Sequence, residues 1–212
     1  MDDFKWAGKL VEDPIAVIVK ADAPWNSLEE FAEWAKANPE KVTYGTTGPT
    51  GRPTFSIAEL FDKLGIDFSK TNMIVTSGAS EIISQIAGGH VHIGMNSVSE
   101  VSNMVKAGKI KMLAVTTKSS YFPDVPTMEE LGYNDFKVNW WLGVAFPKDT
   151  PDYIVEKWEK AMEKASTDTE FLKKLESFNS EVSYLSAAEV KKLADEQYRE
   201  LTDLAIKFGL RK

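Results

Sequence analysis

Residues 42–64, VTYGTTGPTGRPTFSIAELFDKL, join a short apolar run to a loop of glycines and threonines and then to an amphipathic stretch. The run 42–45 combines β-branched and aromatic side chains, which predicts a strand. From Ile57 to Leu64 the apolar residues recur at helical spacing. This spacing predicts a helix with one apolar face, and Gly65 is a typical residue to end it. The stretch is therefore a strand–loop–helix unit.

The same alternation continues on both sides of this unit. Short apolar runs predict further strands, and stretches of helical periodicity separate them. The capping pattern Ser27-Leu-Glu-Glu30 begins one such helix. Strands that alternate with helices of about ten residues indicate an α/β fold with a mostly parallel sheet. The predicted strands of this part are 14–20, 42–45, 72–76, 90–95 and 110–116.

The regular alternation of predicted strands and helices ends after Thr117. A long strand is expected at 138–146, and 182–184 offers one more short strand. Residues 128–131 form at most a short helix. Helical patterns fill most of the remainder, at 151–165, 168–177 and 186–208.

Composition places the chain among soluble globular proteins. Hydrophobic residues make up 43% and charged residues 27%, which is enough apolar material to bury a core. The net charge of −7 argues against sequence-independent nucleic-acid binding, which needs a basic surface. No apolar run approaches the length of a membrane span. The absence of cysteine excludes disulfides, cysteine-bound zinc and a thiol nucleophile.

The loop 46–54 is the strongest candidate for a binding function. It places threonine hydroxyls and two glycines, Gly48 and Gly51, between a strand and a helix. The first amides of a helix have no partner within it, and together with hydroxyls they suit a carboxylate. Arg52 can add a bidentate grip. The alternative is a tight turn without a ligand. The loop lacks the spacing of a P-loop or of a dinucleotide-binding loop.

Two later strand-to-helix turns repeat this chemistry. Ser77-Gly78-Ala79 follows one predicted strand, and Asn96-Ser97 follows the next. Because the carboxyl ends of parallel strands collect at one edge of a sheet, we expect one ligand site there. Its candidate residues are Thr46, Thr47, Gly48, Thr50, Arg52, Thr54, Ser77, Gly78, Ala79, Asn96 and Ser97.

No catalytic or metal-binding group can be assigned from the sequence. His90 and His92 are two residues apart on a predicted strand and therefore share a face. No third ligand accompanies them, so we expect no metal and no cofactor. Because no nucleophile stands beside a general base, we interpret the chain as a binding protein rather than an enzyme.

Several segments, taken together and in order, resemble the tripartite tricarboxylate transporter receptor family, also called the Bug family. No segment is diagnostic singly, but they cover nearly the whole chain. They are Tyr44-Gly-Thr-Thr-Gly48, Ala58-Glu-Leu-Phe61, Gly78 to Gly89-His-Val91, Lys106-Ala-Gly-Lys-Ile110, Leu113-Ala-Val-Thr116, Pro123-Asp-Val-Pro-Thr127, and Trp141-Leu-Gly-Val-Ala145 with Pro147 and Thr150-Pro151.

The resemblance implies the type II periplasmic-binding-protein fold, in which two α/β lobes with mostly parallel sheets close on a ligand. It also implies a periplasmic or otherwise extracytoplasmic receptor. Such a receptor binds a di- or tricarboxylate, an acidic amino acid or an aromatic acid, and delivers it to the membrane subunits of the transporter. The expected divisions are a crossover segment at 1–13, lobe two at 14–116, and the C-terminal part of lobe one at 117–212.

The resemblance assigns ligand loops residue by residue. Thr46-Thr47-Gly48 matches the family's Ser/Thr-Gly loop, and Thr76-Ser77-Gly78 matches a second loop that often reads Tyr-Lys-Gly. Asn96 stands where many members have Asp, which removes a negative charge and adds a donor. The first loop is also one residue longer than usual. These departures leave the identity of the ligand open.

By the same resemblance, the chain begins where the family's first crossover begins. The signal peptide and the first half of lobe one are then missing, and lobe one is incomplete. The apolar faces of helices 151–165 and 186–208 lack their natural sheet in that case. We therefore expect an exposed apolar patch, or a homo-oligomer that covers it.

Two other classes of protein compete with this interpretation. A LysR-type sensor domain shares the fold and binds small acids, but it needs a helix-turn-helix upstream. An enzyme on the same scaffold needs a nucleophile or a cofactor-binding lysine in the crevice. The sequence nominates neither feature, and a shared fold does not fix function.

Overall fold

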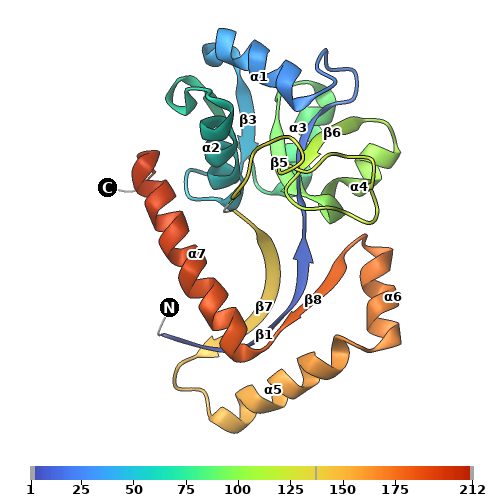
Figure 1. Ribbon diagram of the computed structural model, residues 1–212, viewed down its shortest axis with the longest axis vertical. Coiled ribbons are helices and arrows are strands. Elements are labelled where there is room, and N and C mark those ends of the chain that lie inside the picture. The colour runs from blue at the N-terminus through green and yellow to red at the C-terminus, as the bar shows by residue number, and fades with distance from the viewer. Residues whose placement is uncertain (1–2, 137, 211–212) are drawn as a thin grey trace. The chain divides into compact units, whose positions relative to one another are not determined.

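The computed structural model describes residues 3–136 and 138–210 and divides the chain into two compact units (Figure 1). Unit 1 comprises the residues up to Asp13 together with Asn139–Glu200. Unit 2 comprises Pro14–Val138 and the residues from Leu201 onward. Residues 117–138, which we expected in lobe one, belong to unit 2, where the Met128 N–H donates to the Val115 carbonyl oxygen at 2.8 Å.

Unit 2 is built around two ladders of strands. One ladder has the order β5-β2-β6, and β2 runs antiparallel to both neighbours. The other pairs β3 with β4 in parallel. An isolated parallel bridge between Tyr44 and Ile93 sets β3 beside the start of β5. The strands are β2 (Ile15–Lys20), β3 (Thr43–Thr46), β4 (Asn72–Val75), β5 (Gly94–Ser97) and β6 (Ile110–Val115).

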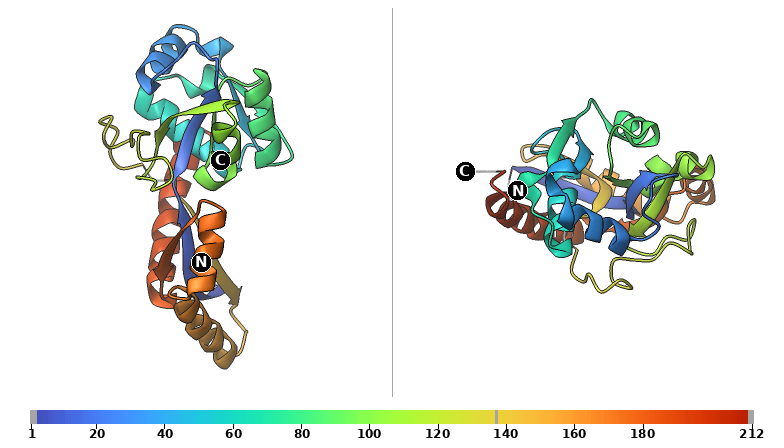
Figure 2. Two further views of the ribbon diagram at one scale, coloured as in Figure 1. Left: turned by 90° about the vertical axis from the view of Figure 1, so that its right-hand side faces the viewer. Right: turned by 90° about the horizontal axis from the view of Figure 1, so that it is seen from above.

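Helices cover both faces of these strands (Figure 2). On one face lie α3 (Ala79–Gly88) and α4 (Val98–Lys106), whose isoleucines and valines pack with Ala16, Ile18 and Val115. On the other lie α1 (Leu28–Ala37) and α2 (Arg52–Leu64). Here the ring of Phe61 stacks on Phe31 and meets Tyr44 edge-on. Each such buried side chain contributes roughly 1.5–3 kcal/mol.

The ends of these helices follow the local sequence. The Ser27 hydroxyl accepts the Glu30 N–H at the start of α1, as the capping pattern predicts. Gly65 and Gly89 end α2 and α3 in the left-handed conformation. Short 3₁₀ turns at Pro39–Lys41 and Phe68–Lys70 precede β3 and β4.

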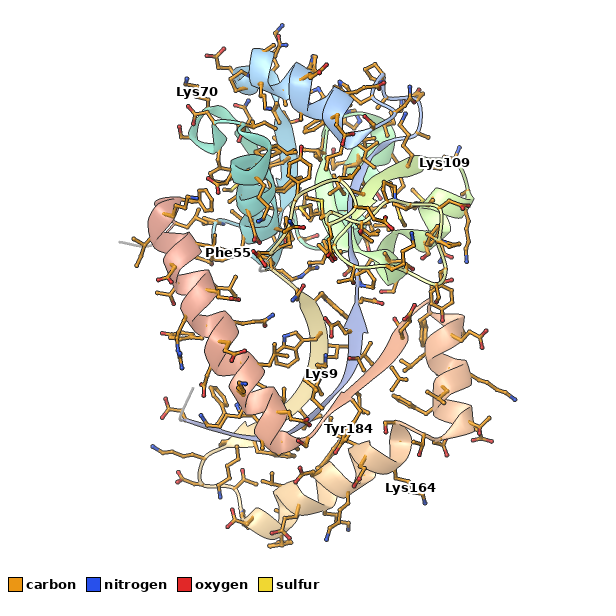
Figure 3. The ribbon with its side chains drawn as sticks, in the orientation of Figure 1. Lys9, Phe55, Lys70, Lys109, Lys164 and Tyr184 are labelled. Atoms are coloured by element: carbon orange, nitrogen blue, oxygen red, sulfur yellow. The ribbon has the colours of Figure 1, made fainter. Side chains whose placement is uncertain are left out.

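Unit 1 contains an antiparallel sheet of order β7-β1-β8. Helix α5 (Asp152–Ala165) packs on it through Val155 and Met162, which contact Ala7, and Tyr184 packs against the same cluster (Figure 3). The other elements are β1 (Phe4–Asp13), β7 (Trp140–Pro147), α6 (Thr169–Ser177), β8 (Glu181–Leu185) and α7 (Ala187–Lys207), whose last two turns, from Leu201, belong to unit 2.

Some expectations from the sequence need correction. The sheet of unit 1 is antiparallel, because its central strand β1 runs opposite to β7 and to β8, which are joined to each other through α5 and α6. Residues 128–131, expected to form at most a short helix, form turns. The strand expected at 90–95 begins only at Gly94, so His90 and His92 lie in the bend that precedes β5 and do not share a strand face.

Large apolar side chains are exposed on unit 1, as the expectation of an uncovered face requires. They include Leu142 on β7 and Val182 on β8, which both pair with Val11 of the central strand. We predict that a second copy of the chain covers them. Sedimentation velocity over a range of protein concentrations measures this oligomeric state. The exposed set in this unit is Phe4, Leu142, Tyr153, Trp158, Phe178, Val182 and Tyr198.

His92 is held in its neutral form by its surroundings in unit 2. Its Nδ1 accepts the Thr43 N–H at 3.1 Å, so this nitrogen carries no proton. Its ring lies against Trp25 and Trp34. Burial lowers the pKa of His92 below the ordinary value of 6.5.

We predict that the free energy of unfolding falls as the pH drops below about 6.5. In this range the unfolded chain takes up a proton at His92 while the folded protein resists it, so protonation favours unfolding. Urea unfolding between about pH 7.5 and 5 measures the slope. His92→Gln should flatten the slope, whereas His90→Gln, at an exposed position, should leave it unchanged. Equal slopes in both variants would contradict the prediction.

Candidate functional site

The carboxyl ends of β3 and β5 define a topological switch point in unit 2. After β3 the chain adds β4 on one side, and it then returns to the other side of β3 for β5. In open α/β sheets, the loops on either side of such a reversal diverge and leave a crevice where ligands bind. The loop after Thr46 and the turn at Asn96-Ser97 border this point, and the loop after β4 lies next to it.

The first loop is held together by hydroxyl groups that point inward. The Thr54 hydroxyl donates to the Gly48 carbonyl oxygen at 2.6 Å, and the Thr46 hydroxyl contacts both that hydroxyl and that carbonyl. Thr46 and Thr54 are fully buried. Gly48 has φ 122°, a conformation that a side chain would strain. Thr46 and Thr54 therefore shape the loop, and Thr47 and Thr50 are its exposed hydroxyls.

The second loop is anchored to the first. The buried Thr76 donates its N–H to the Thr46 carbonyl oxygen at 2.8 Å. The N–H and hydroxyl of Ser77 both donate to Glu81, at 2.9 and 2.8 Å. These bonds lower the pKa of the Glu81 carboxyl. The Ser77 donors are thus taken up by the protein, and the start of α3 at Gly78 and Ala79 has no side-chain cap.

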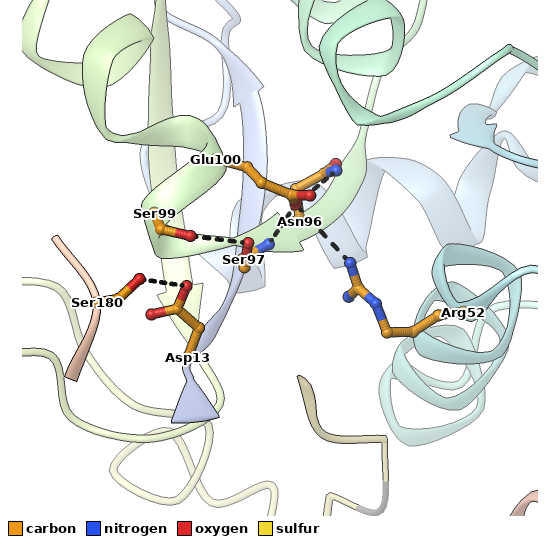
Figure 4. A network of polar contacts seen from close by, with 7 residues as sticks. All are labelled: Asp13, Arg52, Asn96, Ser97, Ser99, Glu100 and Ser180. Carbon is orange, nitrogen blue, oxygen red and sulfur yellow. Dashed lines mark hydrogen bonds and ion pairs between the residues drawn. The ribbon is translucent and has the colours of Figure 1, made fainter. Parts of the chain in front are cut away.

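Asn96 and Ser97 end β5 in a fully buried position, where Glu100 organises them (Figure 4). Glu100 Oε2 accepts the Ser97 N–H at 3.1 Å, as the third residue of a helix does in a capping box. The same oxygen accepts Asn96 Nδ2 at 3.4 Å. The other side-chain atom of Asn96, Oδ1, is buried without a partner.

Arg52 approaches the Oε2 atom of Glu100 from α2, on the opposite face of the strands. Its Nη2 lies 3.8 Å from Glu100 Oε2, and its side chain is 26% exposed (Figure 4). Its Nη1 is buried without a hydrogen-bond partner. Burial lowers the pKa of Arg52, and the Glu100 charge partly offsets this effect. The guanidinium therefore stays cationic and retains an unused donor.

The structure thus brings part of the predicted set together. Arg52, Asn96 and Ser97 meet at Glu100, and Thr46, Gly48 and Thr54 form the loop beside them. Sequence reasoning missed Glu100, although the pattern Ser97-x-x-Glu100 before an apolar stretch is a capping signal that points to it. The assembled groups can bind an anion through Arg52 and accept a hydrogen bond at Asn96.

Two other properties of the described residues bear on function. Within 3–136 and 138–210, no three His, Asp or Glu side chains lie close enough together to hold a metal ion. Over the same residues, no helix combines the length and apolar character that crossing a membrane requires.

Comparison with known proteins identifies the family. The model of the tripartite tricarboxylate transporter family receptor matches residues 1–210. The chain belongs to this family. A curated relative from Cupriavidus necator, a UPF0065 protein in the gbd 5′ region, is 30% identical over 99% of the chain. The chain spans 63% of the length of that relative.

Similar solved structures confirm the predicted fold class. The periplasmic binding protein BugD is 26% identical, with a TM-score of 0.84 over 99% of this chain and 70% of its own. MatC from Rhodopseudomonas palustris, solved with bound malate, superposes with a TM-score of 0.85 at 22% identity, over 96% of this chain and 70% of its own. At that identity the second likeness concerns the fold alone.

We predict that Thr54→Val lowers the stability of unit 2 by about 1–2 kcal/mol. The substitution keeps the shape of the side chain but removes the donor to the buried Gly48 carbonyl oxygen. Chemical denaturation measures the change. Thr54→Ser keeps the hydroxyl and should recover most of the loss, so an equal loss in both variants would assign the effect to packing instead.

Proposed function

We propose that this protein is an extracytoplasmic solute-binding receptor that captures a small carboxylate and hands it to the membrane subunits of a tripartite transporter. The ligand class comprises di- and tricarboxylates, acidic amino acids and aromatic acids. Membership of the tripartite tricarboxylate transporter receptor family supports both the role and the ligand class. The family is one of receptors, so binding without chemistry is the expected activity.

One observation in the site carries this proposal. Arg52 Nη1 is a buried cationic donor with no hydrogen-bond partner, and it lies at the switch point where an α/β sheet takes its ligand. A buried donor without a partner costs about 1–3 kcal/mol, more when it is charged. A carboxylate oxygen recovers that energy and can take two parallel N–H bonds from a guanidinium.

The other residues of the predicted set differ in whether they can contact the solute or only support the loops. Thr47 and Thr50 can turn their exposed hydroxyls to the solute. Ser97, Gly78 and Ala79 lie at the starts of helices whose dipoles favour an anion. Thr46, Gly48, Thr54, Thr76 and Ser77 support the loops, because their polar groups already bond within the protein.

We predict that carboxylates bind and that other solutes do not. Isothermal titration calorimetry with a panel of carboxylates, and with phosphate, glucose and putrescine as comparison solutes, measures this directly. Binding should also raise the melting temperature, because a ligand of the folded state stabilises it by mass action. A panel in which only the comparison solutes bind would refute the proposed ligand class.

Arg52→Gln should lower the affinity for a carboxylate by about 10- to 100-fold, since a charged hydrogen bond contributes roughly 1.5–3 kcal/mol. Arg199→Gln is the matched control, because Arg199 is exposed on α7 and makes no part of the site. The same titration measures both variants. Equal affinities for Arg52→Gln and the unmodified protein would remove Arg52 from the site.

A further inference from the structure

Helix α2 buries a polar side of its surface as well as an apolar one. Its apolar side, which includes Ile57 and Phe61, packs among the buried side chains of unit 2. Ser56 and Glu59 lie on another side and would face water on an ordinary surface helix, but they are only 0% and 3% exposed. A buried carboxylate is costly unless it accepts hydrogen bonds, so the burial of Glu59 indicates a partner.

That partner is the segment through which the chain leaves unit 2. The stretch of unit 2 that contains α2 ends at Val138, and we call residues 134–136 together with Val138 the exit segment. The Val138 N–H donates to Glu59 Oε2 at 2.9 Å, and Val138 is itself buried. One turn further along α2, Lys63 Nζ donates to the Asn134 carbonyl oxygen at 2.6 Å. Helix α2 therefore holds the exit segment at both ends.

The exit segment is strained between these two bonds. Asp135 has φ 57°, in the left-handed region where residues other than glycine are uncommon. A strained backbone persists only where its surroundings hold it in place. The bonds from Glu59 and Lys63 lie on either side of Asp135 in the chain and supply this hold. Without them, the exit segment is free to relax to another conformation.

The same helix begins in the candidate site. Arg52 is its first residue and Glu59 follows seven residues later, which places both side chains on one side of the helix about two turns apart. The contact of Arg52 with Glu100, at 3.8 Å, is too long to fix that end of the helix. Because a helix is a rigid element, the bonds of Glu59 and Lys63 to the exit segment also determine where Arg52 lies.

We propose that Glu59 is a positioning residue for the capture of a carboxylate. It fixes α2 against the exit segment, and the helix in turn presents Arg52 to the solute. This inference rests on the proposed function, because that function gives Arg52 a solute to hold. Loosening the exit segment should therefore weaken binding, although no group that touches the solute is removed.

Hydrogen exchange at the Val138 amide, followed by NMR without any ligand, tests the contact itself. Glu59→Leu removes the acceptor and should speed exchange by about 10- to 100-fold, the range that the loss of a charged hydrogen bond produces. Glu59→Gln keeps an acceptor oxygen and should stay close to the unmodified protein. Equal exchange rates in Glu59→Leu and the unmodified protein would overturn the inference.

Calorimetry with citrate, L-glutamate and benzoate then tests the effect on capture. The acid that binds the unmodified protein most tightly should bind Glu59→Leu about tenfold more weakly, and Glu59→Gln should recover most of this loss. Ile57→Val is the matched control, because it loosens the apolar side of the same helix, nearly opposite Glu59. Its affinity should stay unchanged. If Glu59→Leu fails to fold, which circular dichroism reveals, Lys63→Met replaces it in both experiments and should lower affinity about fivefold.

The outcomes separate this inference from the proposed function. Unchanged affinity in Glu59→Leu, or an equal loss in Ile57→Val, would overturn the role of Glu59 and leave the carboxylate receptor standing. Binding of none of the three acids by the unmodified protein would count against the proposed function and the inference together.

Discussion

Close packing of α3 on β3 and β5 is the constraint on which the site depends. A Cβ at Gly45 would lie 2.7 Å from Ile82 Cγ2, and one at Gly94 would lie 2.6 Å from Ile86 Cδ1. A side chain at Gly45 would force Ile82 to shift, and one at Gly94 would force the end of Ile86 to move aside, because real Cβ atoms do not approach neighbours so closely. The two glycines let the helix settle on the strands, and its first turn then stands beside the ends of β3 and β5.

The loop after β3, a candidate binding loop, is fixed in place by hydrogen bonds within the protein. The buried hydroxyls of Thr46 and Thr54 both donate to the Gly48 carbonyl oxygen. The N–H of Thr76, in the next loop, donates to the Thr46 carbonyl oxygen. Residues held in this way cannot also serve the solute. Under the proposed function the binding energy must therefore come from groups that the fold leaves unsatisfied, and among the described residues of unit 2 these include Arg52 and Asn96.

Much of unit 2 follows from the sequence because its signals are local. The helical spacing from Ile57 to Leu64, the capping pattern at Ser27 and the glycines that end α2 and α3 each act within one or two turns. The pairing of strands is set by contacts between distant residues. For this reason the antiparallel course of β2 and of the sheet in unit 1 could not be anticipated from periodicity.

The candidate site divides in the same way. The loops were predictable, since glycine and hydroxyl residues between a strand and a helix indicate a loop. The roles within them were not, because a threonine that bonds to its own loop and one that faces solvent look alike in sequence. Thr54 and Thr50 illustrate this: one is fully buried and the other is exposed. Glu100 escaped notice because it acts across the strands on Arg52, a partner far away in the chain.

An acidic protein with a net charge of −7 can still hold an anion, because the relevant field is local. Arg52 is largely shielded from water, so its charge is screened less than that of a surface lysine. Glu100 moderates this charge without cancelling it, since the contact at 3.8 Å is too long for a strong ion pair. Under the proposed function, a weak internal partner suits the release of a solute as well as its capture. It would keep an empty site from exposing a bare cation, and it would compete mildly with a bound carboxylate.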